Sequence, residues 1–330
     1  MQLQLTLIGL GEIGASVGLA LRYQKKDIFR VGLDSRKSAE EATKRVDAVD
    51  KIEHSYADAV KKAHLIVIAV PDGELEPVLD AIAPNLPEDI GILDFSLNKV
   101  RANRLARKYL PNPDQFVGLH AALSPARLAE AQEGWRSARE DLFKDGTLTI
   151  AATETTDPDL LRLAQDFAIL LGAHSAFFAP AEIDALTARS ELAPKIAAAA
   201  FSAAAFRGQG WSDQRKLGGK PFHALSGIGN QDETGLNRAL ELLANRENAL
   251  LAIHEATAAL KELRDALRDE DAERLSRFFD ETSASRRTWI EQYEKAAWRS
   301  EAEVKPERTS MSETLSQFFL GGLLSGKKKN

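Results

Sequence analysis

The segment GLGEIG, residues 9–14, has the residue types and the spacing of a nucleotide-binding turn. It follows a predicted strand, rich in leucine and β-branched residues, over residues 3–10 and leads into a helical stretch that continues to about residue 24. In a G-x-G-x-x-G pattern the first glycine permits a tight turn, the second lets the backbone approach a pyrophosphate, and the third lets the helix pack against the strand. The dipole at the start of the helix then attracts the phosphates. The predicted cofactor contacts in this turn are Gly9, Gly11, Glu12, Ile13 and Gly14.

A carboxylate at the end of the next predicted strand favours NAD as the dinucleotide. Asp34 closes the strand predicted over residues 28–34 and lies 20 residues after Gly14. A carboxylate at this position accepts hydrogen bonds from the ribose hydroxyls and repels a 2′-phosphate. Ser35 and Arg36 follow directly, and Arg36 can stack on adenine or bind that phosphate. NADP therefore stays open as the alternative, and all three residues are predicted cofactor contacts.

Three further strands end in residues that should border the bound dinucleotide or its substrate. The run LIVIAVP, residues 65–71, is unbroken and apolar, which is typical of a strand buried on both faces of a parallel sheet. Ligands of open α/β sheets bind at the carboxyl ends of the strands. The predicted cofactor contacts here are Val70, Pro71 and Asp72. The polar residues that end the next two strands, and so should meet a substrate, are Asp94, Ser96, Asn98, Lys99 and His120.

The elements that position these residues predict an α/β protein with an N-terminal Rossmann fold. Short strand-like runs alternate with helical stretches up to about residue 150, which indicates right-handed βαβ units in a doubly wound sheet. After about residue 178 the pattern is helical, with heptad-like leucines between residues 236 and 267. We predict a dinucleotide-binding domain over residues 1–178, an all-α substrate and dimerisation domain over 179–300, and a charged linker with a short apolar tail over 301–330. The helical domain is the predicted homodimer interface.

Composition excludes several other classes of protein. The 330 residues include no cysteine, which removes disulfides and thiolate metal sites and favours a reducing cytoplasm. The six histidines lack the spacing of a metal site, so no metal is predicted. A net charge of −6 lacks the basic field that nucleic acid requires. The longest apolar stretch, residues 196–206, has 11 residues, whereas a membrane span needs about 20. A cytoplasmic enzyme with a small-molecule substrate is the class that remains.

The motifs together resemble the prephenate/arogenate dehydrogenase family of tyrosine biosynthesis. GLGEIGASVGLAL is similar to the family's opening segment, LIVIAVP to its third strand, DFSLNK to its D-x-x-S-x-K loop, and FVGLH to the segment that carries its catalytic histidine. LLANRENALLAI, residues 242–253, is similar to a later helix of the family. The resemblance runs over roughly residues 3–290.

The resemblance implies an oxidative decarboxylation. Hydride passes from the carbon that bears a hydroxyl to the nicotinamide, a histidine takes or polarises the hydroxyl proton, and loss of CO2 makes the ring aromatic. His120 is then the base, and its ionisation should appear near pH 6.5 unless a neighbour shifts it. Ser96 would hold the hydroxyl or the nicotinamide amide, and Asn98 is a further substrate contact. Lys99 is expected to be a surface lysine in the first turn of a helix.

The chain also departs from the family pattern where a substrate would bind. His120 is followed by AALS instead of Pro-Met-Ala-Gly, and the family's histidine–aspartate pair is Ile183-Asp184. Residues 190–194 lack the family's two histidines, and its carboxylate-binding arginine falls at Gly227. Prephenate carries two carboxylates and needs cations to hold them. The candidate replacements are Arg189 and Lys195, with Arg215 and Lys220 as further options.

Three functions stay open on the sequence. The first is a tyrosine-pathway dehydrogenase, which the cofactor motif and His120 favour. The second is a dehydrogenase for another small hydroxyacid, in which Lys195, at the start of an alanine-rich helix, would be the catalytic group. The third is a non-catalytic nucleotide-sensing protein, which the missing substrate cations favour and the retained His120 opposes.

Overall fold

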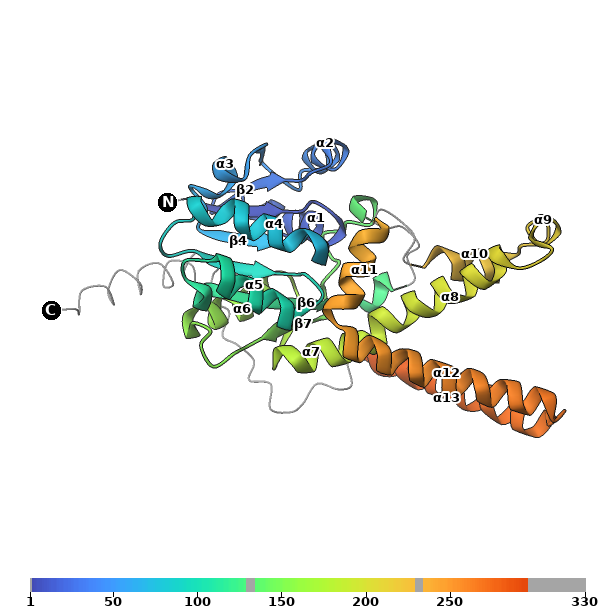
Figure 1. Ribbon diagram of the computed structural model, residues 1–330. Coiled ribbons are helices and arrows are strands. Elements are labelled where there is room, and N and C mark those ends of the chain that lie inside the picture. Colours follow the sequence, from blue (N-terminus) through green and yellow to red (C-terminus); the bar gives the residue numbers. More distant parts are fainter. Residues whose placement is uncertain (1, 129–133, 229–233, 296–330) are drawn as a thin grey trace. The chain divides into compact units, whose positions relative to one another are not determined.

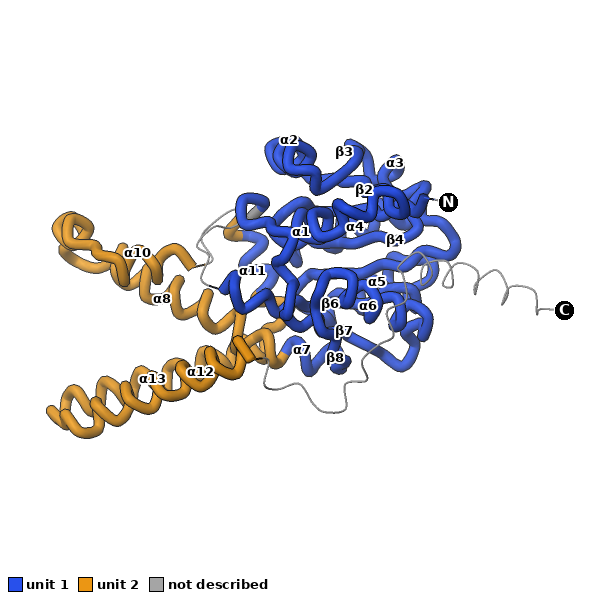
Figure 2. The backbone as a smooth tube through the Cα atoms, turned by 180° about the vertical axis from the view of Figure 1, so that it is seen from behind, with its two compact units in different colours: residues 1–184, 236–241, 305–330 blue, residues 185–235, 242–304 orange. Residues whose placement is uncertain are grey.

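The computed structural model describes residues 2–128, 134–228 and 234–295, and the chain divides into two compact units (Figures 1 and 2). The first unit contains Met1–Asp184 and Leu236–Glu241, and the second contains Ala185–Gly235 and Leu242–Val304. The domain boundaries expected from the sequence stay predictions. The expected linker and tail, residues 301–330, lie outside the described residues.

The first unit is built on an eight-stranded sheet with the order β3-β2-β1-β4-β5-β6-β7-β8. The strand order reverses at β1, which lies between β2 and β4, and such a switch point is where open α/β sheets bind ligands. The predicted Rossmann-type sheet is confirmed. The strands are β1 (Leu3–Ile8), β2 (Ile28–Leu33), β3 (Lys51–Ile52), β4 (Leu65–Ile68), β5 (Gly91–Asp94), β6 (Phe116–Ala122), β7 (Thr147–Ala151) and β8 (His174–Phe178).

One pair of strands departs from the parallel arrangement that the alternating pattern predicts. β6 and β7 run antiparallel, whereas all other neighbours are parallel. The described part of their connection holds only short 3₁₀ turns, at Pro125–Arg127 and Gly134–Arg136. A parallel crossover needs a connection of a dozen or more residues, usually a helix. The antiparallel return places His120 of β6 opposite Thr149 of β7.

Helices cover both faces of this sheet (Figure 1). In β4, Leu65 and Val67 belong to the hydrophobic core on one face, and Ile66 and Ile68 belong to the core on the other. This double burial is the reason that the run is apolar at every position. The helices of the first core include α1 (Glu12–Ala20) and α6 (Pro158–Leu170), and those of the second are α3 (Tyr56–Val60), α4 (Asp72–Ile82) and α5 (Lys99–Tyr109). The chain also forms α2 (Lys37–Arg45), α7 (Pro180–Thr187) and α11 (Gly235–Ala244).

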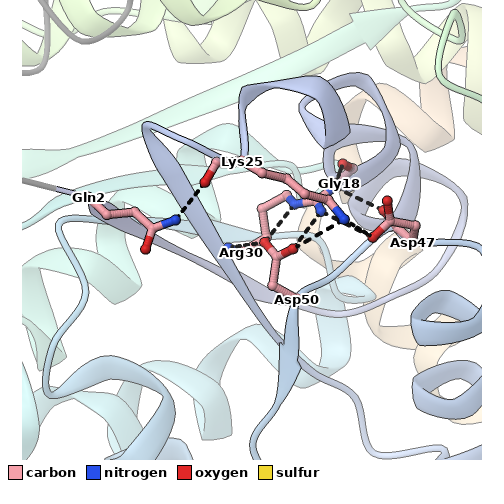
Figure 3. Close-up of polar contacts among 6 residues, drawn as sticks. All are labelled: Gln2, Gly18, Lys25, Arg30, Asp47 and Asp50. Carbon is pink, nitrogen blue, oxygen red and sulfur yellow. Dashed lines mark hydrogen bonds and ion pairs between the residues drawn. The ribbon is translucent and has the colours of Figure 1, made fainter.

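A buried arginine ties α1 to β2 (Figure 3). Arg30 of β2 is fully buried, and its Nη1 donates to the backbone oxygens of Gly18 in α1 at 2.7 Å and Asp47 at 2.9 Å. Its Nε and Nη2 donate to the carboxylate of Asp50 at 3.0 and 2.8 Å. The buried charge is therefore paired and its donors are satisfied, which is the condition for tolerating it in a core. This cluster fixes α1, whose N-terminus forms part of the glycine turn.

The second unit is helical, as the sequence predicts. A π-helical turn, Ala188–Leu192, joins α7 to α8, and α12 and α13 lie side by side as a long hairpin (Figure 1). No helix that the structure describes is long and apolar enough to cross a membrane. The helices are α8 (Ala193–Arg207), α9 (Trp211–Gln214), α10 (Lys220–Gly227), α12 (Arg246–Arg268) and α13 (Ala272–Lys295).

Candidate active site

The glycine turn has the geometry that a dinucleotide requires. Gly9 has a φ of +91°, and a Cβ there would lie 2.3 Å from the oxygen of Ala69. A Cβ on Gly14 would lie 1.9 Å from the oxygen of Gly9, so neither position accepts a side chain. Gly11 is different, because a Cβ there would meet only Nη2 of Arg36, at 3.9 Å. The space beside Gly11 and the N-terminus of α1 fit a pyrophosphate.

Asp34 and Arg36 lie together beside this turn. Oδ2 of Asp34 accepts a hydrogen bond from the N–H of Leu10 at 2.7 Å, and its Oδ1 accepts from N and Nε of Arg36 at 2.8 and 3.1 Å. The Asp34 side chain is buried to 4% exposure, whereas that of Arg36 is 43% exposed. The carboxylate is therefore fixed to the turn, and the guanidinium is the group that can move. Ser35, between them, is exposed.

The residues after β4 contact two different parts of the site, the glycine turn and the loop after β5. Val70 lies against the turn, with its Cγ1 3.0 Å from the position of a Cβ on Gly9, and Pro71 is the N-cap of α4. Asp72 is buried, and its carboxylate accepts hydrogen bonds from the N–H of Leu97 at 2.6 Å and from the N–H and side-chain amide of Asn98. The cofactor contact expected for Asp72 stays a prediction, and the structure adds that this residue holds the loop after β5.

That loop, residues 94–99, carries Ser96 in an unexpected position. The D-x-x-S-x-K spacing from Asp94 puts the family's serine at position 97, where this chain has leucine. Ser96, one residue earlier, is buried and donates its hydroxyl to Oδ2 of Asp94 at 2.5 Å. Its N–H donates to Oδ1 of the same carboxylate at 3.2 Å. The hydroxyl proton of Ser96 is therefore engaged within the loop.

Asn98 is held by two contacts but keeps one unsatisfied atom. Its Nδ2 donates to Asp72 and, at 3.2 Å, to the oxygen of Glu241 in α11. Its Oδ1 is buried and has no hydrogen-bond partner among the described residues. A buried acceptor without a donor is costly, at about 1–3 kcal/mol. An amide or hydroxyl of a bound ligand would satisfy it.

Lys99 corrects a sequence expectation, because it is fully buried and is not a surface lysine. Its Nζ donates to the backbone oxygen of Ser96 and, at 3.5 Å, to that of Asp94. Burial lowers the pKa of Lys99, while the carboxylates of Asp94, Asp72 and Asp184 oppose this change. Burial also raises the pKa of Asp94, against the opposing charge of Lys99.

Asp184 caps the helix that follows this loop. Its Oδ1 and Oδ2 accept hydrogen bonds from the N–H groups of Lys99 at 2.6 Å and Val100 at 3.0 Å, at the start of α5. A carboxylate at a helix N-terminus is stabilised by the helix dipole. From the sequence, Asp184 is known only as the aspartate of a family pair whose histidine is missing here. Its role as a cap could not be predicted, because the two N–H groups that it binds lie 84 and 85 positions earlier in the chain.

His120 lies near the carboxyl end of β6 and is half-buried. The hydroxyl of Thr149 donates to its backbone oxygen at 3.3 Å. Burial and the positive charge of Lys99 lower the pKa of His120 to about 4. The imidazole is therefore neutral at pH 7 and can accept a proton. The neighbour that shifts it is the lysine that sequence reasoning placed at the surface.

The cations proposed for substrate carboxylates belong to the second unit. Arg189 lies in the π-helical turn, where its Nη2 forms an exposed ion pair with Glu255 at 2.8 Å. The hydrogen bond from Arg189 lowers the pKa of Glu255, and the same bond raises the pKa of Arg189. Lys195, in the first turn of α8, is half-buried, while Arg215 and Lys220 are exposed. Among the described residues no group of three or more His, Asp or Glu side chains could hold a metal.

The fold and the site are those of a dinucleotide-dependent oxidoreductase, and known proteins resemble the chain over most of its length. Residues 17–177 match the model of the nucleotide-binding domain of prephenate dehydrogenase. Prephenate dehydrogenase of Bacillus subtilis is 24% identical over 275 residues, 83% of this chain and 72% of that protein. Cyclohexadienyl dehydrogenase of Zymomonas mobilis is 22% identical over 289 residues, 86% of this chain and 94% of that protein.

The fold agrees with a solved member of this group. The crystal structure of Aquifex aeolicus prephenate dehydrogenase, in complex with hydroxyphenyl propionate and NAD+, has a TM-score of 0.73 and 20% identity. The match covers 87% of this chain and 98% of that one. Together these findings confirm that the chain resembles the prephenate/arogenate dehydrogenase family, as its motifs indicate. It is an NAD(P)-dependent dehydrogenase.

Proposed function

We propose that this protein oxidises and decarboxylates prephenate or arogenate in tyrosine biosynthesis, with His120 as the base and NAD as the preferred dinucleotide. The observation that carries the proposal is a neutral, half-buried imidazole near the carboxyl end of β6, in the sheet that carries a complete glycine turn. The names of the related enzymes from Bacillus subtilis and Zymomonas mobilis support the substrate class.

Different residues of the chain would bind the cofactor and accept the proton. The turn at Gly9, Gly11 and Gly14 would hold the pyrophosphate, and Asp34 the adenosine ribose. NAD, when bound, supplies the hydride acceptor. His120 accepts the proton of the substrate hydroxyl as that carbon is oxidised, and the ring then loses CO2 to become aromatic. General-base catalysis of this kind contributes about 10²–10⁴ in rate.

NAD is favoured over NADP by the fixed position of Asp34. Its carboxylate is anchored by the N–H of Leu10 and keeps a negative charge next to the ribose site. Arg36 is paired with this carboxylate and would have to leave it to bind a 2′-phosphate. The substrate carboxylates would be held by Lys195, with Arg189 after exchange of its partner Glu255, and Asn98 would offer its Oδ1 to a hydroxyl or an amide.

We also propose that the enzyme acts in the cytoplasm as a homodimer formed through its helical unit. Apolar side chains lie exposed along α12 and α13, where a second copy would cover them. Contiguous exposed apolar surface marks interaction sites. These side chains include Leu250, Leu260, Leu267, Phe279 and Trp289.

A direct assay distinguishes this function from its alternatives. Pure protein is incubated with NAD or NADP and with prephenate, arogenate or a panel of 3-hydroxyacids, and absorbance is followed at 340 nm. Turnover of prephenate or arogenate with release of CO2 supports the proposal. Turnover of a 3-hydroxyacid alone would establish the second function, and NAD binding without turnover of any substrate would establish a sensing role.

A further inference from the structure

Lys99 is a fully buried lysine that the reaction described above does not use. A buried ammonium group is unfavourable unless it is paired and hydrogen-bonded. Three carboxylates from three elements supply opposite charge, namely Asp94 at the end of β5, Asp72 at the start of α4, and Asp184 in α7. These carboxylates act on Lys99 through their charge, while its Nζ donates to backbone oxygens of the loop after β5.

The side chain of Lys99 lies on the backbone of the strand that carries His120. A Cβ on Gly118 would lie 2.8 Å from Cδ and 3.7 Å from Cε of Lys99. Gly118 and His120 are two positions apart in β6, and such residues face the same side of a sheet. The Lys99 stem therefore crosses β6 on the His120 face. The glycine in the Gly-Leu-His segment is required because a larger residue would push the lysine away.

The charged groups around this pair are few. The charge of Lys99 lowers the pKa of His120, and no other charged side chain among the described residues contributes to that pKa. Lys99 in turn is surrounded by Asp94, Asp72 and Asp184. Its Nζ also donates to the backbone oxygens of Ser96 and Asp94, so the ammonium group is tied to the loop between β5 and α5.

We propose that Lys99 is a positioning residue of the active site, which presents a fixed positive charge to His120 across Gly118 and ties the 94–99 loop to β6. This proposal rests on the assignment of His120 as the base. The charge adds to the effect of burial, so it lowers further the pH at which the imidazole gains a proton, and it disfavours a lasting imidazolium after proton transfer. Lys99 thereby acts through His120, without contact with the substrate.

The test is an NMR titration of His120 in the full-length protein, with neither cofactor nor substrate present. The signal is assigned by its loss in His120→Asn, because the chain has five other histidines. In the wild type the titration should have a midpoint near pH 4. In Lys99→Met the midpoint should rise by about one pH unit, because a nearby charge contributes shifts of this size. It should stay below 6.5, since burial, the larger cause, remains.

A matched lysine variant and a glycine pair complete the test. Lys108→Met, at an exposed lysine that pairs with Glu76, should leave the midpoint unchanged. Gly118→Ala keeps every charge but displaces the Lys99 stem, so it should raise the midpoint in the same direction as Lys99→Met. Gly235→Ala, where a Cβ meets nothing within 4 Å, is its control. The glycine pair decides the matter if Lys99→Met fails to fold.

The outcomes separate this proposal from the proposed function. A midpoint that rises in Lys99→Met and Gly118→Ala but not in the two controls supports it, as does a matching shift in the acid limb of the kcat profile. A midpoint unchanged within 0.3 units in folded Lys99→Met, or in Gly118→Ala, overturns it. Because the titration needs no substrate, failure of turnover on prephenate and arogenate would overturn the proposed function while leaving this measurement intact.

Discussion

Gly11 and Gly14 lie in the same turn but differ in what surrounds them. At the scale of single residues, substitutions at the two positions should therefore have different effects on NAD binding and on stability. A side chain at Gly11 enters open space, whereas one at Gly14 meets the oxygen of Gly9 at 1.9 Å. We expect Gly11→Val to remain folded and to lose NAD binding by at least about 100-fold, because the side chain fills the pyrophosphate space. Gly14→Ala should instead lower the melting temperature. Calorimetric titration and thermal unfolding measure the two effects, and unchanged NAD affinity in folded Gly11→Val would contradict the site.

Cofactor choice depends on two adjacent charges. Asp34→Asn keeps an acceptor for the N–H of Leu10 but removes the charge that repels a 2′-phosphate. We expect it to raise the ratio of kcat/KM for NADP over NAD by about tenfold, which corresponds to about 1.4 kcal/mol. Arg36→Ala should lower the same ratio. A wild-type enzyme that already prefers NADP would show that Arg36 outweighs Asp34.

The pH dependence of turnover follows from the environment of His120. Its pKa of about 4 means that the base is unprotonated throughout the neutral range. We expect kcat/KM to stay level from pH 8 to about pH 5 and to fall below that, as the imidazole gains a proton. An acid limb centred near the ordinary histidine value of about 6.5 would contradict the buried setting of His120.

At the scale of elements, a substitution of the buried Arg30 tests whether its hydrogen bonds hold α1 against β2. Arg30→Met leaves Asp50 and the oxygens of Gly18 and Asp47 without their donors, so we expect a loss of about 3–5 kcal/mol in the free energy of unfolding. Arg162→Met, which breaks an exposed pair with Asp159, should change it by less than about 1 kcal/mol. Denaturant unfolding compares the two, and equal effects would refute a structural role for the cluster in Figure 3.

The same cluster predicts that the free energy of unfolding decreases in strong acid. Burial raises the pKa of Asp50, but the hydrogen bonds and charge of Arg30 outweigh it, so the pKa lies below 3.8. A lowered carboxyl pKa contributes stability above the unfolded value, and that stability is lost as the pH falls through the folded value. The contribution of Asp50 should therefore be complete above about pH 4 and disappear under stronger acid.

Local patterns predicted the elements whose cause is local. The glycine turn, the doubly buried β4 and the helical second half all follow from spacing or composition within one segment. Lys99 did not follow, because a lysine in the first turn of a helix is usually at the surface. Its burial depends on Gly118, which is 19 positions later, and on Asp184, which is 85 positions later. The antiparallel pairing of β7 was also not predicted, and the described part of its connection to β6 holds only short 3₁₀ turns.

At the scale of the whole molecule, the helical unit is the proposed dimer interface. A fragment cut near residue 180 is an unsuitable test, because it would remove the Asp184 cap of α5 and the α11 contacts of Asn98. A pair of charge substitutions on the full chain, Leu260→Glu and Leu267→Glu, disturbs only the exposed apolar side chains of α12. We expect the wild type to be a dimer and the variant a monomer in light scattering. A monomeric wild type would rule out the proposed interface.

The central claim is that His120 is the base of the reaction, and one measurement tests it most directly. Turnover of prephenate and arogenate is compared in wild type, His120→Asn and Lys195→Met, together with NAD affinity. Asparagine has a similar size but cannot take the proton, so His120→Asn should lower kcat by about 10²–10⁴ while NAD affinity stays nearly unchanged. Lys195→Met should raise KM more than it lowers kcat. Near-normal turnover in His120→Asn, with Lys195→Met inactive, would contradict this mechanism and favour a lysine-dependent hydroxyacid dehydrogenase.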